Sequence, residues 1–312
     1  MKSTNQTEFY FRPFSTLPGI QLVIFLLFFS LYVLSLCGNG AVLLVVYVDR
    51  SLHNPMYFFL GNLAVLEICY SSAIAPVALA NLLSRKAATI SLSGCGTQMF
   101  FFILLGGADC VLLAVMAYDR YLAICYPLHY LLIMSQTVCT GLVAASWLLG
   151  FFLSLQLTIL IFCLPFCGTN EINHFFCDIP AILRLACGDT YAHQAAIFIG
   201  GVTVLTIPFF LICISYAFIV VAMLQIHSDE GRQRAFSTCS SHFMVVLLQY
   251  GCCSFIYLRP SSSYLPEEGR AVSVVYTFFT PLLNPLIYSM RNKELKEALC
   301  KTLRRRVLSW KK

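Results

Sequence analysis

Charged residues are scarce in this sequence. Asp, Glu, Lys and Arg make up 11% of its 312 residues, whereas hydrophobic residues make up 59%. A soluble domain carries roughly 25% charged and 45–50% apolar residues. The composition therefore excludes an ordinary soluble domain and predicts a chain embedded in a lipid bilayer.

Several other patterns are absent as well. The amino-terminal segment has no apolar core of a signal peptide, so we expect it to be retained. Cys252 and Cys253 are adjacent and have no histidine near them in sequence, which does not predict a metal site. No internal repeat is visible, which argues against a transporter. No intramembrane acid has a paired nucleophile, which argues against an enzyme.

Long apolar stretches are present instead. A hydrocarbon core about 30 Å thick requires about 20 apolar residues per helix. Seven such stretches occur, at residues 22–47, 57–83, 97–125, 139–163, 193–226, 236–258 and 271–290. We predict an all-α membrane protein, a seven-transmembrane helix bundle at 22–290. An amino-terminal segment (1–21) precedes it, and a tail (291–312) with a short amphipathic helix follows it.

The distribution of basic residues predicts the orientation of the bundle. An outer amino terminus leaves 13 Lys and Arg residues on the inner side and seven on the outer side, as the positive-inside rule requires. The sequon at Asn5 then lies outside, where it can be glycosylated. We expect a multi-pass plasma membrane protein with an extracellular amino terminus and a cytoplasmic tail. The net charge of +6 then faces anionic lipid, and nucleic acid is not expected as a partner.

Two acids lie in the middle of predicted spans. Glu67 and Asp109 each cost about 2.5 to 3.5 kcal/mol at mid-membrane, so we expect them to have a function. Two facing carboxylates repel, so either a proton or a cation such as sodium should lie between them. Asn39 and Asn284, at comparable depth, could complete the polar cluster. The alternative is a protonated pair that only packs the bundle.

Prolines inside spans predict kinks or hinges. Pro208 lies in the fifth span, and Pro281 and Pro285 lie in the seventh. Tyr216 and Tyr288, near the predicted cytoplasmic ends of these spans, are candidate latches. Static kinks remain the alternative.

Four of the 15 cysteines are predicted to lie on the oxidising side, in loops or at span ends. They are Cys95, Cys167, Cys177 and Cys187. Four cysteines allow three pairings, and the spacing does not select one.

Several motifs together carry a family resemblance. They are Gly38-Asn39, LHNPMY at 52–57, MAYDRY at 116–121, Ser215-Tyr216, AFSTCSSH at 235–242 and PLLNPLIY at 281–288. Over about residues 20 to 300 the chain resembles the rhodopsin-like G-protein-coupled receptors and, among them, the olfactory receptors of the tetrapod-type class II.

The resemblance implies a receptor that binds a small odorant and activates a stimulatory, olfactory-type G protein to raise cyclic AMP. In such receptors the acid matching Asp119 holds the arginine matching Arg120 at rest, and the pair with Tyr121 forms an activation switch. By position alone, this pair would only mark the membrane boundary. The resemblance also gives the switch roles to Asn284, Pro285 and Tyr288.

Other roles follow from the same resemblance. It pairs Cys95 with Cys177 and Cys167 with Cys187, so that the loop between spans four and five becomes a tethered lid. The acids Glu67 and Asp109 match a sodium or proton site, although Asp109 is shorter than the glutamate usual at its position. No other cofactor is expected. Arg232, Arg234, residues 237–242 and the tail helix at 292–303 would offer a basic face to lipid headgroups and the G protein.

Counting along the helices from Arg120 identifies candidate ligand contacts in the outer half of the bundle. They are Phe102, Ile103, Gly106, Gly107, Gly200, Thr203, Val204, Tyr250, Cys253, Ser254, Tyr257, Val274 and Thr277. Ile179, just after Cys177 in the lid, is a further candidate. Phe102 replaces the aspartate of amine receptors, and the seventh span has no lysine for a retinal Schiff base. We therefore expect a small, neutral, hydrophobic odorant. A receptor of the same family that binds a metabolite outside the nose is the alternative; the oligomeric state is not predicted.

Overall fold

The computed structural model describes residues 7–15, 17–84, 88–167, 169–187, 190–225, 229–258 and 266–309. Within these ranges, seven helices are long and apolar enough to cross a membrane. Two of them contain a π-helical turn and so consist of three consecutive elements. The spans are α1 (Pro18–Val48), α2 (Pro55–Leu83), α3 (Leu92–Cys125), α5 (Gln136–Phe162), α7–η2–α8 (Tyr191–Gly201, Val202–Thr206, Ile207–Leu224), α9 (Asp229–Tyr257) and α10–η4–α11 (Pro266–Val274, Val275–Phe279, Thr280–Arg291).

The seven-helix prediction is confirmed, with most helix ends close to those expected. α9 begins at Asp229, before the predicted start at 236, because the polar segment ahead of the apolar stretch continues the helix. α3 begins at Leu92, where the Ser91 side chain accepts a hydrogen bond from the Gly94 backbone N–H and caps the helix. Asn54 caps α2 in the same way by accepting from Tyr57.

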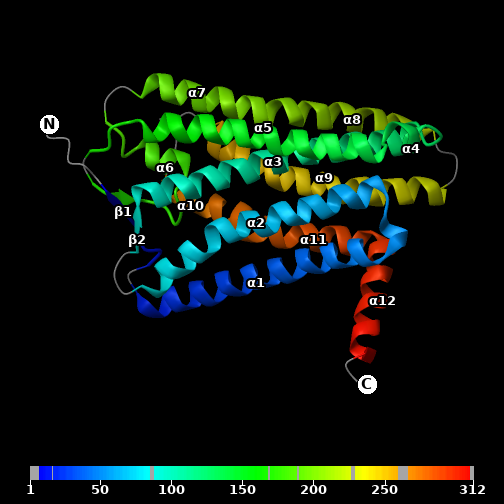
Figure 1. The fold of residues 1–312 in the computed structure, drawn as a ribbon, viewed down its shortest axis with the longest axis horizontal. Helices are drawn as coiled ribbons and strands as arrows, with labels where there is room; N and C mark the ends of the chain where they lie inside the picture. The colour runs from blue at the N-terminus through cyan, green and yellow to red at the C-terminus, as the bar shows by residue number, and fades with distance from the viewer. Residues whose placement is uncertain are drawn as a thin grey trace.

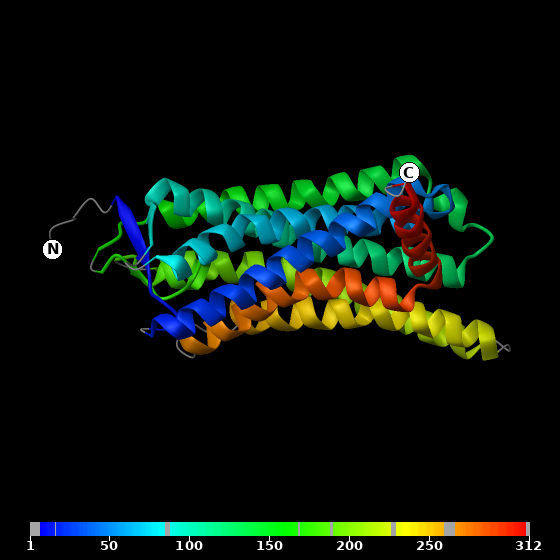
Figure 2. The same ribbon diagram turned by 90° about the horizontal axis from the view of Figure 1, so that it is seen from below.

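The helices form one elongated bundle with α3 at its centre (Figure 1). α3 packs against α2, α5, α8 and α9, whereas α1 packs against α2 and α11. Short helices lie between some of the spans: η1 (Arg50–Leu52), α4 (Tyr130–Ile133) and α6 (Ile179–Leu183). The tail helix α12 (Lys293–Ser309) runs crosswise to the spans at one end of the bundle and points away from it, and it extends beyond the predicted end at 303 (Figure 1 and Figure 2).

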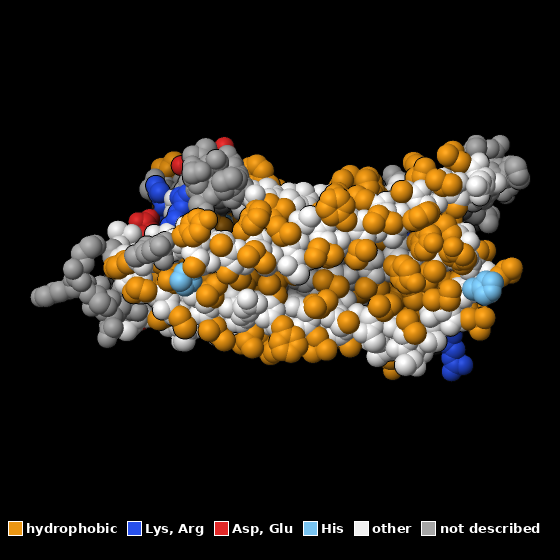
Figure 3. Space-filling view, turned by 90° about the horizontal axis from the view of Figure 1, so that it is seen from above, with side chains coloured by type: hydrophobic (Ala, Val, Ile, Leu, Met, Phe, Trp, Pro, Cys, Tyr) orange, Lys and Arg blue, Asp and Glu red, His pale blue; other side chains and the backbone are white. Residues whose placement is uncertain are grey.

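The surface pattern agrees with a membrane location. On the face shown in Figure 3, hydrophobic side chains cover the length of the bundle, and the visible charged side chains lie near its two ends. Such a belt is expected where lipid tails, rather than water, contact the helices. The prediction of a multi-pass membrane protein is therefore confirmed.

A small sheet covers the end of the bundle opposite α12, which we call the amino end; the end with α12 is the tail end. Strand β1 (Glu8–Phe11) pairs antiparallel with β2 (Thr89–Ser91) and parallel with β3 (Glu171–Ile172). The side chains of Phe9 and Phe11 are buried beneath it. The sequence analysis did not predict these strands, because short polar-flanked segments of this kind form strands only when their partners are brought together.

Both π-helical turns precede a proline. η2 ends two residues before Pro208, and η4 ends two residues before Pro281. A proline removes a backbone donor and disturbs the helix preceding it, and π turns are a common local solution. Pro285 lies inside α11, and its ring packs so closely against Gly38 that a Cβ atom there would be 3.1 Å from it.

Candidate ligand-binding cavity

A cavity lies between α3, α5, α7, α9 and the loop that contains α6. The space open to the centres of water-sized molecules is about 80 Å³. One water needs at least 10–15 Å³ on this measure, so the cavity admits a small molecule only. It is lined by Tyr70, Phe102, Ile103, Gly106, Gly107, Cys110, Leu153, Leu157, Ile179, Ile197, Gly200, Gly201, Val204, Leu205, Gln249, Cys253 and Tyr257.

Nine of the predicted contacts line this cavity. They are Phe102, Ile103, Gly106, Gly107, Ile179, Gly200, Val204, Cys253 and Tyr257. Helix counting located eight of them because the rise per residue is fixed, so depth in the membrane follows from distance along the chain. Ile179 was inferred instead from its place after Cys177 in the loop.

The other predicted contacts face elsewhere. Tyr250 turns its hydroxyl to the Cys110 carbonyl oxygen of α3, 2.7 Å away. Thr277 is fully buried within the π turn η4, and Ser254 and Val274 are not among the lining residues. Thr203 lines a second hollow on the side of the bundle, between α3, α5 and α8. Counting gives depth but not direction around the helix axis, and the π turns change that direction further.

Three lining residues that the sequence analysis missed carry polar groups, namely Tyr70, Gln249 and Cys110. The Cys110 thiol lies beside the side chains of Cys253 and Gln249, where α3 meets α9 at the cavity wall. Gln249 is a polar residue deep in a span. The same feature identified Glu67 and Asp109 in the sequence, so it could have identified Gln249 as well.

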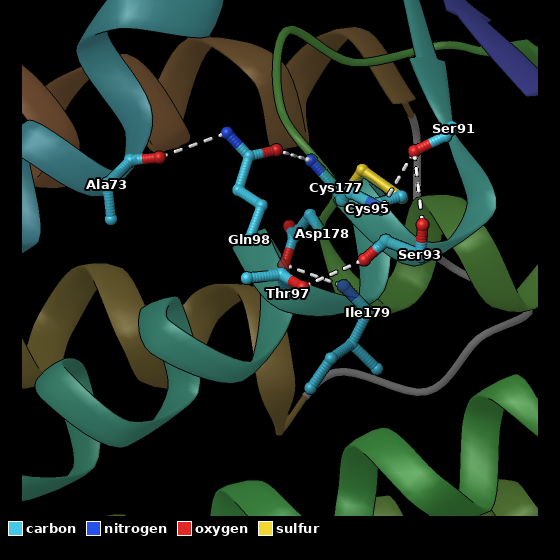
Figure 4. The surroundings of a disulfide bond; sticks show 10 residues. Ala73, Ser91, Ser93, Cys95, Thr97, Gln98, Cys177, Asp178 and Ile179 are labelled. Carbon is cyan, nitrogen blue, oxygen red and sulfur yellow. Dashed lines mark hydrogen bonds between the residues drawn. A yellow bond between two sulfur atoms is a disulfide. The ribbon is translucent and has the colours of Figure 1, made fainter.

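The loop between α5 and α7 closes the amino end of the cavity. Disulfides join Cys95 to Cys177 and Cys167 to Cys187, as the resemblance implied. The Gln98 side chain of α3 accepts from the Cys177 backbone N–H at 3.0 Å and donates to the Ala73 carbonyl of α2 at 3.1 Å (Figure 4). The loop is therefore tied to two spans next to Ile179, the residue that reaches the cavity.

Two ionisable residues of this loop are completely buried. His174 Nε2 lies 3.1 Å from the Ser273 hydroxyl and 4.0 Å from Asp178 Oδ2. Burial, together with the nearby charge of Arg270, lowers the pKa of His174 to about 3. Burial raises the pKa of Asp178 to about 7, against the hydrogen bonds that it accepts. His174 is thus neutral at physiological pH, so this contact is not an ion pair.

Arg270 joins α10 to the amino-terminal segment. Its guanidinium carbon lies 4.6 Å from the centre of the Phe14 ring, a cation–π contact. It also donates to the Pro13 carbonyl oxygen at 3.4 Å. Phe14 in turn packs edge-on against Phe28 of α1, with ring centres 5.4 Å apart. The amino-terminal segment is therefore part of the cover over this end of the bundle.

The two membrane acids lie beside a small space below the cavity, lined by Leu66, Glu67, Tyr70, Leu105, Asp109 and Gln249. The Asn284 amide donates to Glu67, whereas Asp109 Oδ1 is buried and has no hydrogen-bond partner within the described part of the chain. Asn39 does not join them, because its amide donates to the Pro281 carbonyl oxygen at 2.9 Å. The space has no volume open to a water-sized molecule, so a hydrated sodium ion does not fit this arrangement.

The structure corrects the predicted contact between Asp119 and Arg120. In the part of the chain that the structure describes, these two residues form no ion pair. Asp119 accepts a hydrogen bond of 2.7 Å from the Tyr130 hydroxyl of α4, and Arg120 donates to the Met56 sulfur. Neighbouring side chains on a helix point in different directions, so each finds a partner on another element.

Hydrogen bonds at the tail end connect α9 to α3 and α8. The fully buried His242 reaches the Leu113 carbonyl oxygen at 3.0 Å and the Tyr216 hydroxyl at 2.8 Å. Tyr216 also donates to the Cys239 carbonyl oxygen at 3.0 Å. Tyr216 therefore connects α8 to α9, whereas the Tyr288 hydroxyl is buried and has no partner among the described residues.

Some predicted features cannot be placed. Asn5 lies outside the described residues, as do the side chains of Arg232, Arg234, Ser237 and Thr238. Tyr121 is described and packs against Tyr126 and Phe218, with ring centres 5.7 Å away in each case.

Comparison with known proteins agrees with this architecture. The family model described as olfactory receptor matches residues 28–306. Human olfactory receptor 10V1 is 63% identical over 305 residues, which cover 98% of this chain and 99% of that protein. Human olfactory receptor 10Q1 is 57% identical over 97% of this chain and 95% of its own length. The chain therefore belongs to the olfactory receptor family and is an odorant receptor of the G-protein-coupled class, not an enzyme.

Proposed function

We propose that this receptor binds a small, neutral, hydrophobic odorant in the cavity at the amino end and activates a stimulatory, olfactory-type G protein at the tail end. The observation that carries the proposal is the small cavity between the spans, lined mainly by Phe, Leu, Ile and Val side chains and by glycines. Apolar walls with a few polar groups are typical of sites that bind a ligand by contact area and one or two hydrogen bonds. No lining residue is charged.

The route of coupling follows α9. Cys253, Gln249 and Tyr257 present one face of α9 to the cavity. Toward the tail end, the same helix is held on α3 by Tyr250 and His242, through carbonyl oxygens of Cys110 and Leu113. A ligand that presses on the cavity face displaces α9, breaks these contacts and opens the tail end. Because these contacts are either formed or broken, the receptor has two states, and a ligand can shift the balance between them.

Arg120 is the residue that we expect to engage the G protein. It is buried at the centre of the tail end, and its Nε atom has no hydrogen-bond partner in the structure. A contact with a methionine sulfur is weak, so movement of α9 releases the arginine at small cost. Asp119 remains held by Tyr130.

We further propose that the amino terminus is extracellular and the tail cytoplasmic, in the plasma membrane. The proposal is supported by the excess of basic residues at the tail end. For Glu67 and Asp109 we propose a shared proton rather than sodium, supported by the lack of space between them.

The test is cyclic AMP production in cells that express the chain together with an olfactory-type stimulatory G protein, challenged with small volatiles. We expect a response in wild type and at least a tenfold loss in Arg120→Ala at matched surface expression. Arg50→Ala, in the short helix η1 after α1, is the control and should keep the response. An unchanged response in Arg120→Ala would contradict the proposed role of this arginine, and silence of wild type at the surface would contradict the coupling.

A further inference from the structure

The polar groups of the cavity differ in what they offer a ligand. Tyr257 of α9 lines the cavity, and so does Ile179 of the loop. The Tyr257 hydroxyl and the Ile179 backbone N–H both donate to the same atom, Asp178 Oδ1, at 2.8 and 2.9 Å. The Asp178 carboxyl group therefore lies directly behind the cavity wall, although it is not itself a lining residue.

Asp178 is held firmly in that position. It is completely buried, and it follows Cys177, which is bonded to Cys95 and anchored by Gln98 (Figure 4). Because its Oδ1 atom already accepts from the backbone of Ile179, it acts as the acceptor toward Tyr257 as well. This direction holds whether or not a proton resides on Oδ2.

The consequence concerns the one proton of Tyr257. A phenol has a single proton and two lone pairs. The proton points to Asp178, and the Tyr276 hydroxyl, 3.4 Å away, uses at most one lone pair. What remains for the cavity is a lone pair, so Tyr257 accepts a hydrogen bond from a ligand but does not donate one.

The other polar groups of the cavity are not restricted to accepting. The Gln249 side chain, beside the Cys110 thiol at the wall between α3 and α9, carries both a donor and an acceptor. Tyr70 lies next to the membrane acids, and its hydroxyl can donate as well as accept. A ligand that only accepts hydrogen bonds leaves one lone pair of the Tyr257 oxygen without a partner in an apolar site, whereas a donating ligand pairs it.

We propose that this receptor selects small apolar molecules that carry a hydroxyl group, alcohols or phenols, whose O–H donates to Tyr257, and that Asp178 is the positioning residue that fixes this selection. The inference rests on the proposed function, because it takes this cavity as the ligand site. A protonated amine also donates, but it would bring an unpaired charge into an uncharged cavity. A carboxylate has no proton to donate.

The test compares three probes of similar size, each with one oxygen atom, of which only the alcohol donates a hydrogen bond: n-heptanol, its isomer methyl hexyl ether, and methyl pentyl ketone. Binding to the purified receptor in lipid nanodiscs is measured from the ligand-dependent rise in melting temperature. In wild type, the alcohol is expected to bind roughly tenfold more tightly than the ether or the ketone. Equal binding of the three, or no binding of the alcohol, would overturn the proposal.

Three variants separate the roles of the two side chains. Tyr257→Phe removes the acceptor and should abolish the preference for the alcohol. Asp178→Ala frees the Tyr257 proton for donation, so the ketone should bind more tightly. The difference in affinity between the alcohol and the ketone should then become smaller or change sign. Asp178→Asn retains an acceptor oxygen and should keep the wild-type order. A merely structural role of Asp178 would weaken all three probes equally. If Asp178→Ala does not fold, a preference that persists in Tyr257→Phe still overturns the proposal.

Signalling with the same probes separates this inference from the proposed function. Selective binding of the alcohol without cyclic AMP would support the ligand class and contradict the proposed coupling. Cyclic AMP responses of equal potency to all three probes would support the coupling and overturn the ligand class.

Discussion

At the scale of single residues, Asp178 links the stability of the lid to pH. A free aspartate releases its proton near 3.8, whereas burial raises the pKa of Asp178 to about 7. Between these values the folded protein binds the extra proton, so the Asp178 contribution to stability falls as the pH rises toward 7 and is constant above it. His174 acts in the opposite direction between about pH 3 and 6.5. We expect the melting temperature of wild type, minus that of Asp178→Asn, to decrease by several degrees from pH 5 to 7.5.

The control for this measurement is Glu171→Gln, in the same loop. Glu171 is exposed to solvent and lies 3.8 Å from Arg12, so its variant should shift the melting temperature by a similar amount at each pH. If the melting temperature of wild type minus that of Asp178→Asn rises with pH or stays constant, the assignment of a buried, protonated Asp178 is contradicted.

At the scale of elements, the contact between α3 and α5 depends on small residues. A Cβ atom at Gly150 would lie 2.4 Å from the Leu104 carbonyl oxygen and 3.0 Å from the Ala108 nitrogen, both backbone atoms of α3. The Ser154 hydroxyl of α5 also donates to α3, at the Phe100 carbonyl oxygen. Such close approach is typical of membrane helix pairs. Gly150→Ala should therefore separate the helices and reduce surface expression and melting temperature, at a cost of about 1–3 kcal/mol or more.

Gly141 on the same helix provides the matched control. A Cβ atom there meets nothing within 4 Å, and alanine favours the helix more than glycine by about 1 kcal/mol. Gly141→Ala should leave the receptor at least as stable as wild type. Equal behaviour of the two variants would show that the close contact of α3 and α5 does not limit stability.

At the scale of the whole molecule, the two disulfides constrain the chain to different degrees. Cys95 and Cys177 are 82 residues apart, whereas Cys167 and Cys187 are 20 apart. In the chain-entropy model, closing these loops stabilises the fold by about 4.5 and about 3.3 kcal/mol. The first disulfide also joins a span to the lid over the cavity. We expect the double variant Cys95→Ser/Cys177→Ser to lose more melting temperature and surface expression than Cys167→Ser/Cys187→Ser.

Thermal unfolding of the two double variants, side by side in nanodiscs, measures this order. Replacing both cysteines of a pair avoids a new free thiol that could form a wrong disulfide. If the variant without the 167–187 pair is the less stable of the two, local packing of the loop, rather than chain entropy, determines the contribution of each disulfide.

The sequence by itself determined that the chain crosses a membrane seven times, where along the chain it does so, and to which family it belongs. Apolar length and motifs encode these properties directly, and the depth of eight cavity residues followed from helix rise alone. Only the tertiary structure decided which faces of the helices meet. Lipid and protein interior are both apolar, so the spans have little polar asymmetry from which direction could be inferred. For that reason Asp119 found Tyr130 instead of Arg120, Tyr250 turned toward α3, and the proton of Tyr257 was committed to Asp178.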